Sequence, residues 1–270
     1  MGKKNILYVI GSPRSGSTLI YNALCSDNKT NPPLPESHLV DKIASIYAYQ
    51  FNRLEIEKDY IFDDEKDIVN YLNKSMKIFF DKIIKKYNTD TLILKSIVCS
   101  PNAHILHHIF PKISFILCVR DPRDIVNSMI NIGKRQAENG IDAQFTRNIE
   151  QLCRRINDSY RILFEKKLSK NFFNSLNIVK YEDFVKNPSD ILNKISLDLS
   201  LKIKFKKKLS TWKRNKEVYR NYHYGYQSKL WNKPISDKNI GAYKKNLTKK
   251  EIVKINDLCS NLISRFDYII

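Results

Sequence analysis

Short apolar runs rich in β-branched residues recur along the chain and predict buried strands. They cover residues 6–10, 91–95, 113–119 and 175–180. Runs of this length and composition are typical of strands buried on both faces of a parallel sheet. The run at 113–119 is the clearest of them, and it ends at Arg120.

Segments with helical spacing separate these runs. The pattern predicts a helix from Ser17, one long helical stretch over 39–87, and further helices over 103–110, from Asp124, and over 142–170. The acidic run at 63–65 marks the start of a second helix within the long stretch. Strands that alternate with helices predict an α/β fold, a three-layer P-loop-like parallel sheet flanked by helices.

The domain organisation follows from the absence of internal repeats and low-complexity linkers. We expect a single domain over residues 1–270, with a helical insertion around 39–88. A basic, aromatic-rich segment around 202–245 has no clear period. It either lines and closes a binding pocket or forms an amphipathic helix whose tyrosines (Tyr222, Tyr224 and Tyr226) are core residues.

Composition narrows the classes of partner. The 270 residues carry a formal net charge of +19, which favours anionic ligands. The lysines are spread over all segments, so a nucleic-acid-binding module is a weak alternative. Five scattered cysteines without a CxxC pair indicate reduced thiols. No apolar run reaches the about 18 residues of a membrane span, and we expect a cytoplasmic protein.

A glycine-rich turn joins the first strand to the first helix. Gly11-Ser-Pro-Arg-Ser-Gly-Ser-Thr18 has the frame of the nucleotide-binding loop GxxxxGK[ST], whose backbone N–H groups hold phosphate. Ser17 stands where that loop has lysine, and the cation lies inside the loop at Arg14. The segment therefore predicts a phosphate site that differs from an ATPase loop.

A second cation ends the strand at 113–119. Phosphoryl-transfer enzymes place a magnesium-binding aspartate at such a strand end, whereas this chain has Arg120. Two anion sites without a metal-binding acid indicate a nucleoside with phosphates at both ends. The alternative for Arg120 is a structural salt bridge with Asp121 or Asp124, and Arg123 is expected on the surface at a helix start.

These residues resemble PAPS-dependent sulfotransferases over nearly the whole chain. Residues 13–19 resemble the family's 5′-phosphosulfate loop, 119–128 its 3′-phosphate segment, 179–184 its YED segment and 239–247 its late closing segment. The resemblance implies the sulfotransferase fold and a set of donor-binding residues: Pro13, Arg14, Ser15, Gly16, Ser17, Thr18, Arg120, Ser128, Tyr181, Asn239, Ile240 and Gly241.

Within the family, the chain is most similar to the tyrosylprotein-type and related bacterial carbohydrate-type branch. Lys95 takes the place of that branch's catalytic lysine, and Ile97 stands where aryl-type enzymes have a catalytic histidine. The resemblance implies Glu36 as general base, with His38 as its rival, and Lys95 and Arg14 as catalytic cations.

The implied reaction moves a sulfuryl group from PAPS to an acceptor hydroxyl and releases adenosine 3′,5′-bisphosphate, without a metal. The acceptor is a carbohydrate, another alcohol or a tyrosine, and the oligomeric state stays open. The runner-up is a nucleotide or adenylylsulfate kinase, which would depend on magnesium. His104, His107 and His108 lie on one predicted helix in a spacing that does not suit a metal, so we expect surface and core roles.

Overall fold

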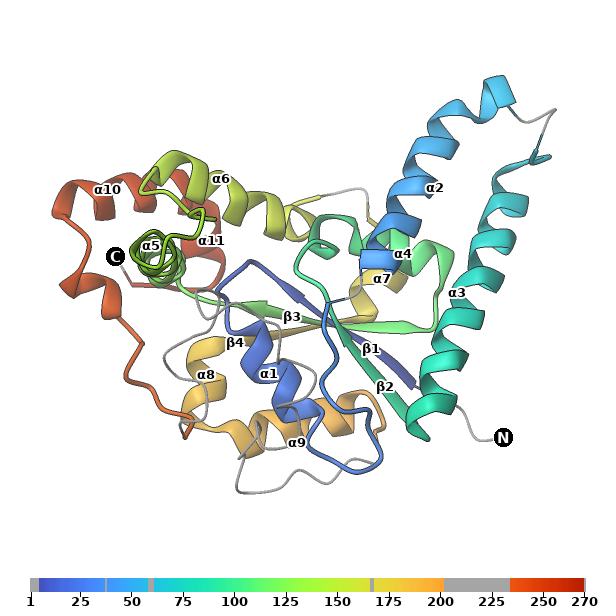
Figure 1. The fold of residues 1–270 in the computed structure, drawn as a ribbon, viewed down its shortest axis with the longest axis horizontal. Helices are drawn as coiled ribbons and strands as arrows, with labels where there is room; N and C mark the ends of the chain where they lie inside the picture. Colours follow the sequence, from blue (N-terminus) through green and yellow to red (C-terminus); the bar gives the residue numbers. More distant parts are fainter. Residues whose placement is uncertain (1–4, 37, 58–60, 166–167, 202–233, 270) are drawn as a thin grey trace.

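The computed structural model describes residues 5–36, 38–57, 61–165, 168–201 and 234–269. Within them the strands form a four-stranded parallel sheet with the order β2-β1-β3-β4 (Figure 1). The strands are β1 (Asn5–Gly11), β2 (Thr91–Lys95), β3 (Ile113–Val119) and β4 (Leu176–Lys180). All four predicted strands are confirmed. Most of the predicted segment at 202–245 lies outside the described residues.

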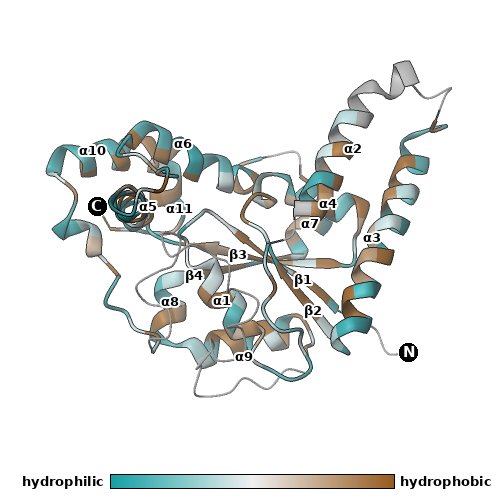
Figure 2. Cartoon of the chain, in the orientation of Figure 1, coloured by the Kyte–Doolittle hydropathy of each residue, from teal (hydrophilic) through white to brown (hydrophobic). Residues whose placement is uncertain are grey.

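Both faces of the sheet are buried along β1, β2 and β3, whereas the edge strand β4 is partly exposed, with Ile178 at 42%. Ile6, Tyr8 and Ile10 of β1 belong to one apolar cluster, whereas the alternating Leu7 and Val9 belong to a second cluster. This alternation follows from the two-residue period of a strand. The strands are accordingly coloured as mostly hydrophobic, while the helices carry hydrophilic residues on their outer faces (Figure 2).

Helices cover each face, which confirms the predicted three layers (Figure 1). On the second face lie α1 (Ser17–Leu24), α8 (Tyr181–Lys186) and α9 (Pro188–Asp198). On the first lie α2 (His38–Glu57), α3 (Glu65–Tyr87), α4 (Ala103–Ile109), α5 (Pro122–Glu138), α6 (Ile149–Tyr160), α7 (Lys170–Asn174), α10 (Lys249–Leu258) and α11 (Ser260–Arg265). Short 3-10 helices are η1 (Ser100–Asn102), η2 (Arg161–Leu163) and η4 (Ala242–Lys245).

Two predicted helix starts are wrong. The helix expected from Asp124 begins at Pro122, because the Asp121 side chain accepts a hydrogen bond from the Arg123 amide at 2.9 Å and caps the helix there. The helix expected over 142–170 begins only at Ile149, where the Asn148 side chain caps it. The α3 start near residue 64 is confirmed, with Asp64 as its cap.

The residues before α6 form a loop because they pack against α5. A Cβ on Gly133 of α5 would lie 1.7 Å from the carbonyl oxygen of Phe145. The Gln144 amide also donates to the side chain of Gln136, over 2.8 Å. These contacts override the helical pattern of the segment.

The chain after α1 runs along the free edge of β2. The amides of Asp90 and Thr91 donate to the carbonyl of Lys29. The Asn31 side chain accepts from the Ile93 amide at 2.7 Å and donates to the Ile93 carbonyl at 2.9 Å. This contact fixes the start of the loop that carries Glu36. None of the described helices is long and apolar enough to cross a membrane.

Candidate functional site

The glycine-rich turn lies between β1 and α1, and two glycines let it pack closely. Gly16 has a φ of +94°, and a Cβ there would lie 2.5 Å from Cδ2 of Tyr181. Gly11 has a φ of +147°, and a Cβ there would lie 2.6 Å from the Cys118 carbonyl oxygen in β3. Among the described residues no side chain caps the start of α1. Its first amides are therefore placed to hold an anion.

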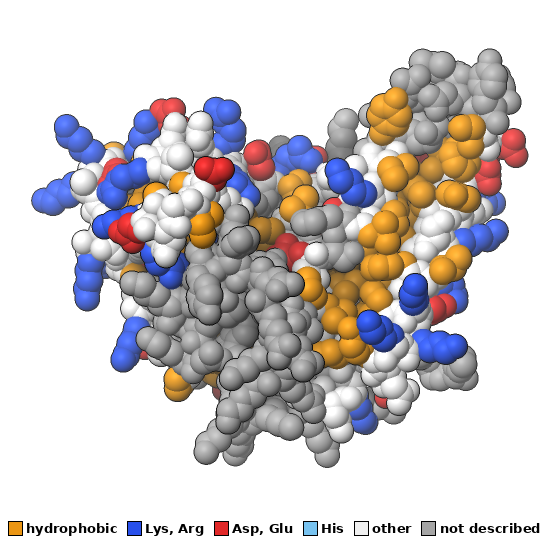
Figure 3. Space-filling view, viewed as in Figure 1, with side chains coloured by type: hydrophobic (Ala, Val, Ile, Leu, Met, Phe, Trp, Pro, Cys, Tyr) orange, Lys and Arg blue, Asp and Glu red, His pale blue; other side chains and the backbone are white. Residues whose placement is uncertain are grey.

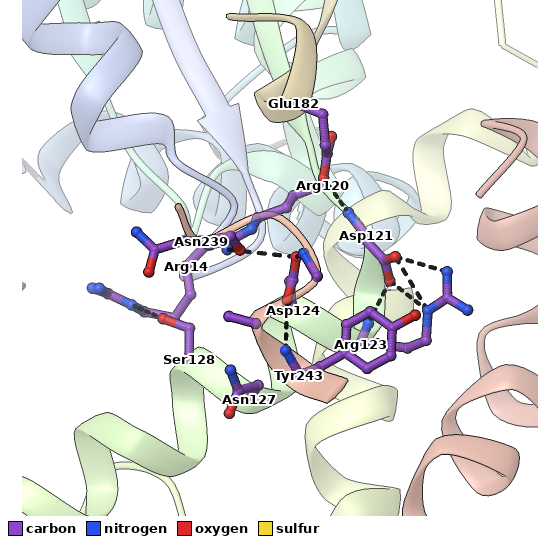
Figure 4. Close-up of polar contacts among 12 residues, drawn as sticks. Arg14, Arg120, Asp121, Arg123, Asp124, Asn127, Ser128, Glu182, Asn239 and Tyr243 are labelled. Carbon is purple, nitrogen blue, oxygen red and sulfur yellow. Dashed lines mark hydrogen bonds and ion pairs between the residues drawn. The ribbon is translucent and has the colours of Figure 1, made fainter. Parts of the chain in front are cut away.

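Arg14 and Ser128 bring the two predicted phosphate segments into contact. The Arg14 Nε donates a hydrogen bond to the Ser128 Oγ of α5, over 3.2 Å (Figure 4). The two residues are 114 positions apart. The family resemblance implies that they bind opposite ends of the nucleotide. The segments meet because β1 and β3 are neighbours in the parallel sheet and end at the same edge.

Arg120 lies at the centre of this group, at the end of β3. Its Nη1 donates to the Arg14 carbonyl at 3.3 Å and its Nη2 to the Asn239 carbonyl at 2.9 Å (Figure 4). Its guanidinium carbon lies 4.2 Å from the centre of the Tyr181 ring. Its buried Nε has no hydrogen-bond partner among the described residues. A guanidinium held in this way keeps donor capacity for a ligand.

The structural alternative for Arg120 is present in part. Arg120 Nη2 lies 3.8 Å from an Asp124 carboxylate oxygen, a long ion pair. Asp121 pairs instead with Arg123, over 2.7 Å. The prediction of Arg123 as a surface residue is therefore wrong. Its side chain is buried because it also donates to the Ile269 carbonyl and stacks on the Tyr243 ring.

Asp124 anchors the late segment that contains Asn239, Ile240 and Gly241. Its carboxylate accepts hydrogen bonds from the Gly241 amide at 2.8 Å and the Tyr243 amide at 3.0 Å (Figure 4). Burial raises the pKa of this carboxyl, while the charge of Arg120 and these two amides act against that rise. The sequence analysis missed this role, since an aspartate in the first turn of a helix carries no sign of a partner so far along the chain.

A third arginine lies near Arg14. Burial, together with the charges of Arg120 and Arg135, lowers the pKa of the Arg14 guanidinium to about 10. Arg135 is seven residues after Ser128 on α5, so both lie on one face of that helix. This spacing was a signal available in the sequence and was missed. Because like charges destabilise one another, three neighbouring arginines favour a bound anion.

Glu36 and Lys95 form an ion pair beside this group. The Lys95 ammonium donates to one Glu36 carboxylate oxygen, and the Ile97 amide donates to the other at 3.3 Å. Both side chains are largely buried, with exposed fractions of 9% for Lys95 and 16% for Glu36. Lys95 pairs with Val9 of β1 in the sheet register, which places it next to the phosphate loop.

The remaining predicted residues lie in the same region. Pro13, Ser15 and Ser17 are buried in the loop and α1, and Thr18 and Ile240 are partly buried. Tyr181 is buried between Gly16 and Arg120 at the start of α8. The side chain of His38 lies outside the described residues. No group of three or more histidine, cysteine or acidic side chains among the described residues could hold a metal.

Known sulfotransferases are similar to this chain in sequence and in fold. A sequence model described as the sulfotransferase family matches residues 7–204. The chain is similar in structure to the sulfotransferase domain from the curacin biosynthetic pathway, with 19% identity, a TM-score of 0.60, and coverage of 96% of this chain and 99% of that one. The comparison with curated proteins gave no match.

Two further structures are similar. The sulfotransferase domain of the Synechococcus PCC 7002 olefin synthase has 18% identity and a TM-score of 0.61, and the match covers 100% of this chain and 98% of that one. Sulfotransferase STF9 from Mycobacterium avium has 14% identity and a TM-score of 0.51, over 100% of this chain and 79% of that one. At these identities the likeness shows a shared fold.

Proposed function

The chain belongs to the sulfotransferase family, and we propose that it transfers a sulfuryl group from PAPS to an acceptor hydroxyl. The observation that carries the proposal is the meeting of two groups at the ends of three adjacent strands. Arg14, Arg120 and Ser128 form one group, and Glu36 and Lys95 form the other. Family membership goes against both alternatives, the kinase and the nucleic-acid-binding module.

The first group fits a donor with phosphates at both ends of its nucleoside. Arg120 and Ser128 hold the 3′-phosphate, and the Arg120 Nε, which has no hydrogen-bond partner within the described part of the chain, is a further donor. The amides of residues 16–18 and the side chains of Ser17 and Thr18 hold the 5′ end. Pro13 and Gly16 shape that turn, and the segment with Asn239, Ile240 and Gly241 closes over the nucleoside beside Tyr181. Arg135 adds positive charge on the Arg14 side.

The second group supplies the transfer chemistry. PAPS brings an activated sulfuryl group. Glu36 accepts the proton of the acceptor hydroxyl as that oxygen bonds to sulfur. The bond from sulfur to the 5′-phosphate oxygen breaks, and Lys95 and Arg14 stabilise the charge left on that oxygen. Lys95 pairs with Glu36 in the free protein, so its shift toward the leaving oxygen frees a carboxylate oxygen for the acceptor.

The wider organisation is part of the proposal. Residues 1–270 act as one domain, in which α2 and α3 form a helical insertion. The five cysteines are all buried and unpaired. Such thiols are typical of a reducing compartment, so we place the protein in the cytoplasm.

Donor binding is the first test. Titration calorimetry in the presence of EDTA compares adenosine 3′,5′-bisphosphate with ADP. We expect tighter binding of the bisphosphate, and loss of that preference in Arg120→Ala. Equal affinity for the two nucleotides, or a requirement for magnesium, would contradict the proposal and favour a kinase.

Substitution at Glu36 tests the transfer step. Glu36→Gln keeps bisphosphate affinity within about twofold and lowers transfer from PAPS about a hundredfold or more. Glu65→Gln is the matched control, since Glu65 is also a hydrogen-bonded glutamate but lies on α3. Full activity in Glu36→Gln would assign the base elsewhere, and His38→Asn then tests the rival.

A further inference from the structure

An exposed apolar stripe runs along α2. Leu39, Ile46 and Tyr49 keep exposed fractions of 50%, 52% and 60%. They are spaced by seven and three residues, so they share one face of the helix. The adjoining face carries Val40, Ile43 and Ala44, which are buried in the core. We call Leu39, Ile46 and Tyr49 the α2 stripe.

The stripe begins at the candidate general base. Leu39 lies three residues after Glu36. Tyr49 lies ten positions after Leu39, a distance of ~15 Å along the helix. Val98 adds a further apolar side chain next to this start, with an exposed fraction of 55%. It follows Ile97, whose amide donates to the Glu36 carboxylate. Exposed apolar side chains therefore flank the base on two segments.

The surface view agrees with this arrangement. Hydrophobic side chains form a band that follows α2 and α3 toward the centre of this face (Figure 3). Exposed apolar side chains that gather on one face are typical of interaction sites. The lysine of this face of α2, Lys42, is exposed. Its stem can cover apolar surface while its ammonium stays in water.

We propose that the acceptor is an alcohol with an extended apolar chain, which lies along the α2 stripe while its hydroxyl meets Glu36. The proposal rests on the function proposed above and names its substrate class. Continuity between the stripe and the Glu36–Lys95 pair selects this occupant. A polyhydroxylated sugar would leave the apolar side chains beside the base without apolar contact, whereas an alkyl chain removes them from water.

A chain-length series tests the proposal. Transfer from PAPS is measured with straight primary alcohols from butanol to decanol, below their aggregation concentrations. Full burial of one methylene would raise kcat/KM about fourfold. A chain lying on an open stripe buries about half of its surface. We therefore expect kcat/KM to rise about twofold per added methylene. A flat series would overturn the proposal.

Two variants locate the effect. Leu39→Ser with Ile46→Ser flattens the series and leaves bisphosphate affinity within about twofold, because neither residue belongs to the donor site. Leu197→Ser is the matched control, since Leu197 is 79% exposed but lies on α9 at the other face of the sheet. An unchanged slope in the double variant contradicts the assignment to the α2 stripe.

Direct binding gives a readout that does not depend on turnover. Calorimetry on protein saturated with the bisphosphate compares decanol with butanol, and equal affinities overturn the inference. If wild type binds the bisphosphate and sulfates polar alcohols at rates that do not depend on chain length, only the proposed substrate class is contradicted. Absence of bisphosphate binding contradicts the proposed function itself.

Two other occupants of the stripe are outcomes of the same variants. One such outcome has a flat alcohol series in wild type. If wild type also sediments with phosphatidylglycerol vesicles and the double variant does not, the stripe binds a membrane surface. If the double substitution instead converts a dimer to a monomer in sedimentation velocity, the stripe binds a second copy. Either result overturns the proposal.

Discussion

Arg14 in the phosphate loop donates a hydrogen bond to Ser128 in α5, over 3.2 Å. In the free protein, therefore, the two halves of the proposed donor site satisfy each other. The Ser128 hydroxyl accepts in this contact and keeps its own proton to donate, so it can also bind a phosphate oxygen of the donor. Ser128 therefore links the two halves of the site, which makes it a sensitive test position.

Ser128→Ala removes a hydroxyl proposed to bind the 3′-phosphate. We expect affinity for adenosine 3′,5′-bisphosphate to fall about tenfold or more, because one hydrogen bond to a charged group is worth about 1.5–3 kcal/mol. Affinity for AMP, which lacks that phosphate, stays within about twofold. Ser264→Ala, an exposed serine on α11, is the control in the same calorimetry. Equal losses for both nucleotides would contradict the assignment.

Gly16→Ala tests the close contact between the phosphate loop and Tyr181. The new Cβ would lie 2.5 Å from the ring, so either the loop or Tyr181 must move. We expect a lower Tm and loss of bisphosphate binding. Gly140→Ala shares a positive φ, +67°, but meets no described atom within 4 Å. The backbone strain in Gly140→Ala costs about 1–2 kcal/mol of unfolding free energy. The loss in Gly16→Ala should be larger by about 1–3 kcal/mol, as measured by thermal unfolding.

Asp124→Asn tests the anchor of the late segment. The amide side chain keeps one acceptor oxygen but loses the second and the negative charge near Arg120. We expect faster hydrogen exchange at the amides of Gly241 and Tyr243, and a several-fold weaker bisphosphate affinity. Asp190→Asn, an exposed aspartate in the first turn of α9, is the control. Unchanged exchange at both amides would show that another contact holds the segment.

Glu251 gives the fold an acid-sensitive link. It accepts two hydrogen bonds from Arg147, each 2.8 Å, and caps α10 through Thr248. The Arg147 guanidinium, with Thr248, lowers the pKa of this carboxyl from 4.5 to about 2. A lowered pKa contributes stability that is present above pH 4.5 and is lost as pH falls toward about 2.

Glu251→Gln removes that contribution. We expect the variant to lose about 1 kcal/mol of unfolding free energy at neutral pH, since Arg147 is half-exposed and solvent screens the pair. The difference from wild type should shrink as the pH is lowered through this range, as measured by urea unfolding. A constant difference at every pH would mean that the capping geometry, rather than the charge, carries the effect.

The strands and the phosphate loop could be predicted because their signals are local. An apolar run followed by a glycine-rich turn defines β1 and the start of α1 within a few residues. The proposed roles of Glu36 and Lys95 needed the family resemblance, because the two residues are 59 positions apart. The structure brings them together, while their catalytic roles stay predictions.

The errors have a common physical cause, which is contact with distant residues. Arg123 is charged and lies at a helix start, yet contacts with the C-terminal residues bury it. The residues before Ile149 have a helical pattern, yet the close approach of Phe145 to Gly133 holds them as a loop. Neither contact leaves a sign in the local sequence, so local propensity was overridden.

Asn31 has a consequence for solubility as well as for the position of Glu36. Its side chain occupies the amide and carbonyl of Ile93, on the side of β2 away from β1. Unpaired strand edges are templates on which another chain can add a strand and begin aggregation. The loop that leads to the candidate base therefore also blocks such growth at this edge. A substitution that frees the loop would lower the yield of soluble protein as well as displace Glu36.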